Sequence, residues 1–423
     1  MTPAQMRDDV RLFRTEFLAR DNSYAPAARK EAEARLARLE GRIDQTTPVG
    51  FELALAQIVA LADNAHTIVP AGVRARHFNR VPLRLATFGG DLRVIRATGP
   101  HADLLGARLV SVDGHAAGEV RDSARTLVSG PAHRRDRFAY SLAESPQQLN
   151  AMGLAASAAR ATYLFQTLDG KTVSRQLAAD PVVPDDSRAG ATRVFYPAPL
   201  PEDQGGWRTL LAPEQAPWAL TEPDARFRWR DAPEMQGMVI ELRQTFDAPG
   251  QPIAAFLQEM TRTIMTRQPT NLVIDLRMNG GGNLNTARDF MKSLPNLVRG
   301  RIFALTSPWT FSAAISSLGY LEQAAPDRVT IVGEEVGDRL EFWAEGRAVT
   351  LTSSGIVIAF STQRHDYRNA CRAYTDCHGP VVQNSIAVPT LAPDIAAPWT
   401  VDAYRAGRDP AMEAVQAELK RTR

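Results

Sequence analysis

The feature that most constrains this chain is a regular alternation of apolar strands with helices that begins at Gly237. The segments, in order, are strand 238–242, helix 253–265, strand 271–276, helix 284–293, strand 301–306, helix 312–325, strand 329–332 and a strand-rich tail to 360. Strands separated by helices need crossover connections, which place them parallel in one sheet. We therefore predict an α/β domain over residues 227–423, with a mainly parallel sheet covered on both faces and a last helix at 410–421.

Three further regions precede this domain. Residues 1–75 carry apolar side chains at three- and four-residue spacing and predict an N-terminal helical domain. Residues 76–183 carry short strand-like runs separated by turns, which predict a β-rich module. Residues 184–226 hold many prolines and glycines and are interpreted as a connecting segment. The predicted helices of the first region are 6–19, 27–39 and 51–62.

Charge and hydropathy exclude several classes of protein. The 423 residues include 49 basic and 47 acidic side chains, so no strong field draws the chain to nucleic acid. No apolar run reaches the roughly 18 residues that a membrane span needs. The first residues lack the basic and apolar blocks of a signal peptide. We expect no nucleic-acid partner, no membrane span and no signal peptide in this chain, while the oligomeric state stays open.

The loop after the second predicted strand of the α/β domain contains three consecutive glycines, at 280–282. Glycines let backbone N–H groups turn toward a bound oxyanion or phosphate, although a tight strand-to-helix turn explains them equally well. The loop lacks the spacing of a nucleotide-binding motif, so a nucleotide is not expected. Arg277 is expected to pair internally beside it.

The loop after the next strand brings Ser312 to the start of a helix. A serine there is either a plain N-cap or a nucleophile in the positive field of the helix N-terminus. In the second case the amide of Ala313 can face an anion that develops on a carbonyl.

Together these loops resemble the C-terminal-processing (tail-specific) peptidase family, with its tricorn-type members and the interphotoreceptor retinoid-binding protein modules. The matching blocks are Asn271–Asn283, Thr310–Ala314, Ile331–Gly337, Val388–Asp394 and Ala406–Pro410. The resemblance implies a crotonase-like α/β catalytic domain and a serine peptidase with Ser312 as nucleophile. It also implies an oxyanion hole made by Gly280, Gly281 and Ala313.

The chain departs from the tail-specific members at the lysine of their Ser–Lys dyad. Where that lysine is expected, the sequence reads Gly337-Asp338-Arg339-Leu340, and no lysine occurs between Lys292 and Lys420. Arg339 cannot replace it, because a guanidinium stays protonated at any working pH. Another general base is required if the protein is a hydrolase.

His66 is the best candidate for that base. It lies in an Asp-x-x-His-Thr block that resembles the lysine-free, tricorn-like members, and an imidazole titrates near neutrality. The alternative is a surface histidine at a helix end. A carboxylate should orient the ring, and Asp338 is ranked first, although a turn-forming Gly-Asp pair explains it as well. Asp366 and Glu334 are the other candidates.

The resemblance implies a serine peptidase that hydrolyses peptide bonds through an acyl-enzyme. The alternative is a non-catalytic binder of a peptide or an apolar ligand on the same fold. The β-rich module resembles a PDZ-like domain, which captures an extended peptide at a sheet edge, or it is purely structural. We expect a peptide or unfolded-protein substrate and no cofactor. The family also implies an extracytoplasmic location, periplasmic or secreted.

Two smaller features leave alternatives open. Cys371 and Cys377 are either bridged or free thiols, and with His365 and His378 they form a spacing that fits no common zinc site, so no metal is expected. The cluster Arg134–Arg137 is interpreted as a solvated loop face, with contact to an acidic or carboxylate partner as the alternative.

Overall fold

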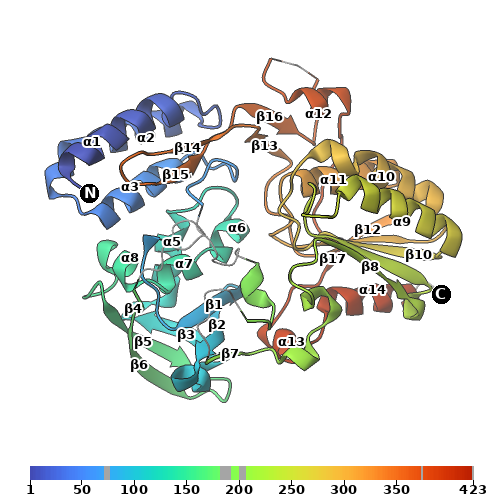
Figure 1. Ribbon diagram of the computed structural model, residues 1–423, viewed down its shortest axis with the longest axis horizontal. Coiled ribbons are helices and arrows are strands. Elements are labelled where there is room, and N and C mark those ends of the chain that lie inside the picture. The colour runs from blue at the N-terminus through green and yellow to red at the C-terminus, as the bar shows by residue number, and fades with distance from the viewer. Residues whose placement is uncertain (71–76, 182–191, 200–205, 373–374, 422–423) are drawn as a thin grey trace. The chain divides into compact units, whose positions relative to one another are not determined.

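A computed structural model of the chain describes residues 1–70, 77–181, 192–199, 206–372 and 375–421. Its internal contacts divide the chain into two compact units (Figure 1). Unit 1 comprises Met1–Gln215 and Phe342–Gln363, and unit 2 comprises Ala216–Glu341 and Arg364–Arg423. The predicted domain boundaries at 75/76 and 183/184 lie outside the described residues.

The N-terminal part of unit 1 is helical, as the apolar spacing predicts. Its elements are α1 (Pro3–Leu12), a π-helical turn (Phe13–Leu18), α2 (Pro26–Gly41), a 3₁₀ turn (Ile43–Gln45) and α3 (Pro48–Ala60). Thr2 and Thr47 cap α1 and α3 through their hydroxyl oxygens, which accept backbone N–H groups of the first turn.

A late hairpin completes the core of these helices. Its strands, β14 (Ala348–Thr350) and β15 (Val357–Ala359), pair antiparallel. Leu351, Ile358 and Phe360 are buried in the same cluster as the helix residues Phe13 and Phe51. The hairpin therefore belongs to unit 1, although the sequence places it after most strands of unit 2.

The β-rich region of unit 1 forms a sheet in the order β1-β2-β3-β5-β6, with β4 paired to β3 and β7 to β2. Its strands are β1 (Leu83–Phe88), β2 (Asp91–Thr98), β3 (Arg108–Val112), β4 (His115–Ala116), β5 (Arg160–Gln166), β6 (Thr172–Ala178) and β7 (Trp207–Thr209). Four short helices that the strand prediction did not include lie between β4 and β5: α5 (Ala117–Arg125), α6 (Ala132–Arg137), α7 (Tyr140–Ala143) and α8 (Pro146–Ala151).

The predicted connecting segment is held against this sheet. β7 pairs with the far end of β2. The buried guanidinium of Arg96 on β2 donates to the carbonyls of Val194, Tyr196 and Ala198. One arginine thus fixes three alternate carbonyls of this stretch, the first of them in the 3₁₀ turn Arg193–Phe195.

Unit 2 is built on a six-stranded sheet in the order β17-β12-β11-β10-β9-β8. The strands are β8 (Phe227–Ala232), β9 (Gly237–Leu242), β10 (Asn271–Asp275), β11 (Ile302–Thr306), β12 (Val329–Gly333) and β17 (Ile395–Ala396). β8 runs antiparallel to β9, and all other neighbours are parallel. The predicted mainly parallel sheet is confirmed.

Helices cover both faces of this sheet (Figure 1). The crossovers α9 (Ile253–Arg267), α10 (Leu284–Leu297) and α11 (Ala313–Ala324) lie on one face. The last helix, α14 (Pro410–Arg421), lies on the other, where Val415 packs with Val273 and Phe303. The result is a mixed α/β architecture in which the loops after β9, β10, β11 and β12 meet at one sheet edge.

The remaining elements are short. β13 (Glu341–Ala344) and β16 (Gln363–Asp366), the strands in which the chain leaves and re-enters unit 2, pair with each other. The others are α12 (Gly379–Gln383), α13 (Val401–Arg405) and 3₁₀ turns at Gly99–Leu104, Arg193–Phe195, Pro213–Gln215, Trp218–Leu220 and Pro233–Met235. In the part of the chain that is described, every helix is too short or too polar to cross a membrane.

Candidate active site

The glycine loop after β10 and the serine loop after β11 are joined by three hydrogen bonds. The Ser307 hydroxyl donates to the carbonyl of Arg277, and the Thr310 hydroxyl donates to that of Leu276 at 2.8 Å. The backbone N–H of Phe311 donates to the carbonyl of Asn279 at 2.9 Å. These bonds fix the two loops against each other, which is the arrangement that parallel strands ending at one edge favour.

Ser312 has a backbone conformation that L-residues rarely adopt. It lies between β11 and α11 with φ 55° and ψ −124°, and its side chain makes no capping hydrogen bond to the helix. A non-glycine residue in this region costs about 1–3 kcal/mol and persists only where its surroundings hold it. The plain N-cap interpretation therefore lacks its hydrogen bond, and the half-buried hydroxyl stays available for other chemistry.

Gly281 lies directly against Ser312. A Cβ atom placed on Gly281 would come within 2.6 Å of Ser312 Cβ and 2.8 Å of the Phe311 carbonyl oxygen, and its φ is +102°. Only glycine fits this position, because both the space and the backbone angle exclude a side chain.

The predicted oxyanion-hole residues differ in what their N–H groups do. The N–H of Gly281 donates to the side-chain oxygen of Asn279 at 2.9 Å. Within the described residues, the N–H groups of Gly280 and Ala313 make no such bond, and Gly280 is exposed. The buried side-chain amide nitrogen of Asn279 also has no partner among the described residues. The site thus combines one engaged N–H with donors that have no partner among the described residues, of which that of Gly280 is on an exposed residue.

Asp338 lies on the loop after β12, which runs along the serine loop. The N–H of Gly337 donates to the carbonyl of Thr310 at 2.8 Å, and the Thr306 hydroxyl donates to the carbonyl of Glu334. Asp338 is buried, and its carboxylate accepts the N–H of Arg339 at 2.9 Å. The structure therefore brings Asp338, Ser312 and the glycine loop into one loop cluster of unit 2.

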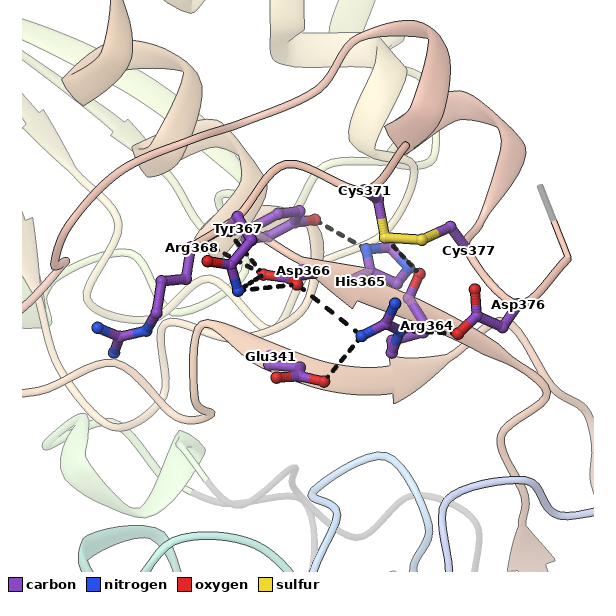
Figure 2. The surroundings of a disulfide bond; sticks show 10 residues. Glu341, Arg364, His365, Asp366, Tyr367, Arg368, Cys371, Asp376 and Cys377 are labelled. Carbon is purple, nitrogen blue, oxygen red and sulfur yellow. Dashed lines mark hydrogen bonds and ion pairs between the residues drawn. A yellow bond between two sulfur atoms is a disulfide. The ribbon is translucent and has the colours of Figure 1, made fainter. Parts of the chain in front are cut away.

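Asp366, an alternative candidate for the carboxylate that orients the imidazole, forms hydrogen bonds within its own turn. Its carboxylate accepts the backbone N–H groups of Arg368 and Asn369, and the amide of Asn369 as well (Figure 2). Burial raises the pKa of Asp366, but these hydrogen bonds and the charge of Arg364 outweigh it and hold the pKa below its ordinary value.

Beside Asp366, a series of hydrogen-bonded, buried polar side chains extends to helix α11. The Tyr367 hydroxyl lies 2.8 Å from Nδ1 of His365 (Figure 2). It also lies 2.6 Å from the Ser316 hydroxyl. Ser316 is one helical turn after Ser312. The hydrogen bond between Tyr367 and Ser316 therefore anchors the first turns of the helix that Ser312 begins. These contacts were not predicted from the sequence, because the residues come from separate elements.

A disulfide between Cys371 and Cys377 closes the loop that follows (Figure 2). On either side of Cys377, the N–H of Arg364 donates to the carbonyl of Asp376, and that of His378 to the carbonyl of Arg364. The bridge settles the alternative that the sequence left open. Both sulfurs are engaged, and the described residues contain no group of three or more metal-ligating side chains.

A buried network of charges lies under the glycine loop. Arg277 makes paired hydrogen bonds with Asp275 and, through two nitrogens, with Asp409 at 2.7 and 2.9 Å. On the neighbouring strand, burial and the charge of Asp275 raise the pKa of Glu241, which Arg243 and Arg228 partly offset. The predicted internal pairing of Arg277 is confirmed, and the role of Asp409 was not foreseen.

His66 belongs to unit 1, where its loop is held by a hydrogen-bonded frame. The side chain of Asn64 donates to the carbonyl of Trp343 at 2.9 Å and accepts its N–H at 2.9 Å. Thr67 donates to buried Asp21 at 2.7 Å. The half-buried imidazole stacks on Phe342, with ring centroids 5.0 Å apart. This is a fixed ring on a rigid loop rather than a free surface histidine.

The prediction of a solvated loop face at Arg134–Arg137 is wrong. These residues form α6, Arg134 is buried with its guanidinium 5.4 Å from the Phe138 ring, and Arg135 pairs with Asp63. The charges are compensated by local partners, so the cluster is structural.

This architecture is similar to that of several solved structures. No family model and no curated protein matches the chain. Among solved structures, mature CPAF matches with TM-score 0.60 at 14% identity, over 99% of this chain and 98% of that chain. The photosystem II D1 C-terminal processing protease (TM-score 0.38, 14% identity, 99% and 97% covered) and the tricorn protease (0.38, 14%, 98% and 37%) also match. The likeness to CPAF shows that the chain shares its fold.

Proposed function

We propose that the protein is a serine peptidase. Ser312 attacks the peptide carbonyl, His66 accepts its proton and returns it to the leaving amine, and water then hydrolyses the acyl-enzyme. The N–H groups of Gly280 and Ala313 stabilise the oxyanion, and the missing side chain of Gly281 lets the glycine loop approach Ser312 closely. Asp338 orients the imidazole.

The observation that carries this proposal is the conformation of Ser312. A serine that only caps a helix has no need of a strained backbone, and it uses its hydroxyl for the cap. Ser312 has φ 55° and no capping bond, and it lies against a glycine that admits no side chain. Strained strand-to-helix turns of this kind present nucleophilic serines in unrelated hydrolases.

Further points concern the two units and the cellular location of the protein. We propose a crotonase-like arrangement for unit 2 and a PDZ-like, peptide-capturing role for the β-rich sheet of unit 1. Disulfides form and persist mainly in oxidising compartments. The Cys371–Cys377 bridge therefore supports an extracytoplasmic location. The substrate is then an exported peptide or unfolded protein.

Labelling with a fluorophosphonate probe tests the mechanism. We expect the wild type to be modified on Ser312, and both Ser312→Ala and His66→Ala to lose at least about 100-fold in labelling rate. Mass spectrometry of the modified peptide identifies the serine. Labelling that survives His66→Ala would remove the histidine from the mechanism, and no labelling of the wild type would favour the non-catalytic binder.

Ser145→Ala is the matched control. Ser145 also precedes a helix, α8, but its hydroxyl accepts the N–H of Gln148. Ser145→Ala should lower the stability by about 1 kcal/mol and leave labelling intact, because it removes a cap. Ser312→Ala should abolish labelling and should not lower the stability through the loss of a cap.

A further inference from the structure

Phe246 is an exposed aromatic side chain beside the glycine loop. It follows β9 and is 53% exposed, whereas almost all other large apolar side chains in the described part of unit 2 are covered. Met265 on α9, at 61%, is the other exception there. A phenyl ring in water lacks the favourable free energy that its burial would supply. The exposed position of Phe246 therefore calls for an explanation.

The backbone that carries Phe246 is fixed rather than loose. The N–H of Thr245 donates to the carbonyl of Gly281 at 2.8 Å, and the N–H of Asn283 donates to the carbonyl of Thr245 at 3.0 Å. The side-chain amide of Gln244 donates to the carbonyls of Phe246 and Asp247. Phe246 therefore projects from a short parallel bridge that the glycine loop itself completes.

Two consecutive glycines separate the ring from the candidate nucleophile. A Cβ on Gly282 would lie 2.6 Å from Cδ1 of Phe246, and a Cβ on Gly281 would lie 2.6 Å from Cβ of Ser312. Since adjacent Cα atoms are about 3.8 Å apart, the ring edge and Ser312 Cβ are at most about 12 Å apart, the reach of three or four extended residues.

We infer that Phe246 forms an apolar subsite for an aliphatic or aromatic side chain of an extended peptide substrate, within a few residues of the bond that Ser312 attacks. The inference rests on the proposed peptidase function and adds a substrate preference to it. The ring gains favourable burial only when such a side chain covers it, while the glycine loop binds the peptide carbonyl next to it.

Two fluorophosphonate probes of equal length test this subsite, one with an alkyl linker and one with a polyethylene glycol linker. Both react with the same serine, so the ratio of their second-order labelling rates isolates the contact made by the linker. We expect the wild type to prefer the alkyl probe by about tenfold, from roughly 55 Å² of apolar contact. Phe246→Ala should abolish this preference, and Phe246→Leu should keep part of it.

Met265→Ala is the matched control. Met265 is as exposed as Phe246, but it lies near the end of α9, which leads into the start of β10, whereas the glycine loop follows the end of β10. Its substitution should leave the probe ratio unchanged. A wild-type ratio near one, or a preference that survives Phe246→Ala, would overturn the subsite while the peptidase proposal stands. A wild type that neither probe labels would overturn both.

Discussion

The guanidinium of Arg277 and the carboxylate of Asp409 form a two-bond pair, at 2.7 and 2.9 Å, beneath the glycine loop. Asp409 also accepts the N–H of Met412 at the start of α14. The pair therefore ties the last helix to the strand that ends in the candidate oxyanion loop. It joins the sequence blocks Asn271–Asn283 and Ala406–Pro410 in the folded chain.

Removing Asp409 should destabilise unit 2. Asp409→Ala leaves Arg277 buried with one partner fewer, and we expect a loss of about 3 kcal/mol, a fall in Tm of about 6–12 °C for a unit of this size. Calorimetry measures it. Glu413→Ala on α14, which removes an exposed pair with Arg408 just before the helix, should lose less than about 1 kcal/mol. Equal losses in the two variants would contradict the assigned role of the buried pair.

A side chain at position 281 should disable the serine. In Gly281→Ala the new Cβ would clash with Ser312 and with the Phe311 carbonyl, and the positive φ adds strain. We expect the fluorophosphonate labelling rate to fall by about 100-fold or more, the scale of losing an oxyanion-hole contact. Gly118→Ala is the control, because no atom lies within 4 Å of its added Cβ. Labelling at the wild-type rate in Gly281→Ala would show that the loop adapts and is not the site.

Glu322 on α11 should make stability depend on pH. Burial, followed by the charge of Asp394, raises the pKa of Glu322 from 4.5 to about 7. Between these values the folded protein holds a proton that the unfolded chain has released, so stability falls as the pH rises through this window. Glu322→Gln removes the penalty. We expect it to gain about 1 kcal/mol at pH 8, after discounting for partial exposure, and nothing at pH 4.

Urea unfolding at both pH values measures this effect, and exposed Asp327→Asn serves as the control, with changes within about 0.5 kcal/mol at either pH. An equal gain for Glu322→Gln at pH 4 and pH 8 would mean that packing, and not the proton, is responsible.

The disulfide should stabilise the loop around His365 and Tyr367 by a modest amount. Cys371 and Cys377 are six residues apart, and closing a loop of that length stabilises by about 2 kcal/mol. Dithiothreitol should lower the Tm of the wild type and leave the Cys371→Ser/Cys377→Ser double variant unchanged. Non-reducing peptide mapping identifies the bridge, and a wild type indifferent to reduction would argue that the bond contributes nothing to the fold.

Elements with strong local signals were predicted closely from the sequence. The last helix was placed at its observed bounds, and α9 and α10 begin at the predicted residues. The four short helices after β4 were not predicted, because segments of four to nine residues show too few turns for a helical period to appear. The predicted helix at 6–19 continues past Leu12 as a π-helical turn, which no spacing rule distinguishes.

The candidate site was predictable only where its residues adjoin in sequence. The glycine loop and Ser312 follow strands whose parallel order was evident, so their meeting at one edge could be anticipated. The Tyr367–Ser316 contact and the Arg277–Asp409 pair join residues 51 and 132 positions apart, and no local pattern encodes them. The engagement of the Gly281 N–H by Asn279 depends on a side-chain rotamer, which a sequence does not display.

The return of residues 342–363 to unit 1 has a consequence for how the protein is made. Leu351, Ile356, Ile358 and Phe360 belong to the same buried cluster as helices near the N-terminus. A nascent chain emerging from the ribosome therefore exposes an unfinished apolar helical surface until the hairpin has been synthesised, well after most of the parallel sheet is out. Interruption of translation before that hairpin leaves the first unit without part of its interior.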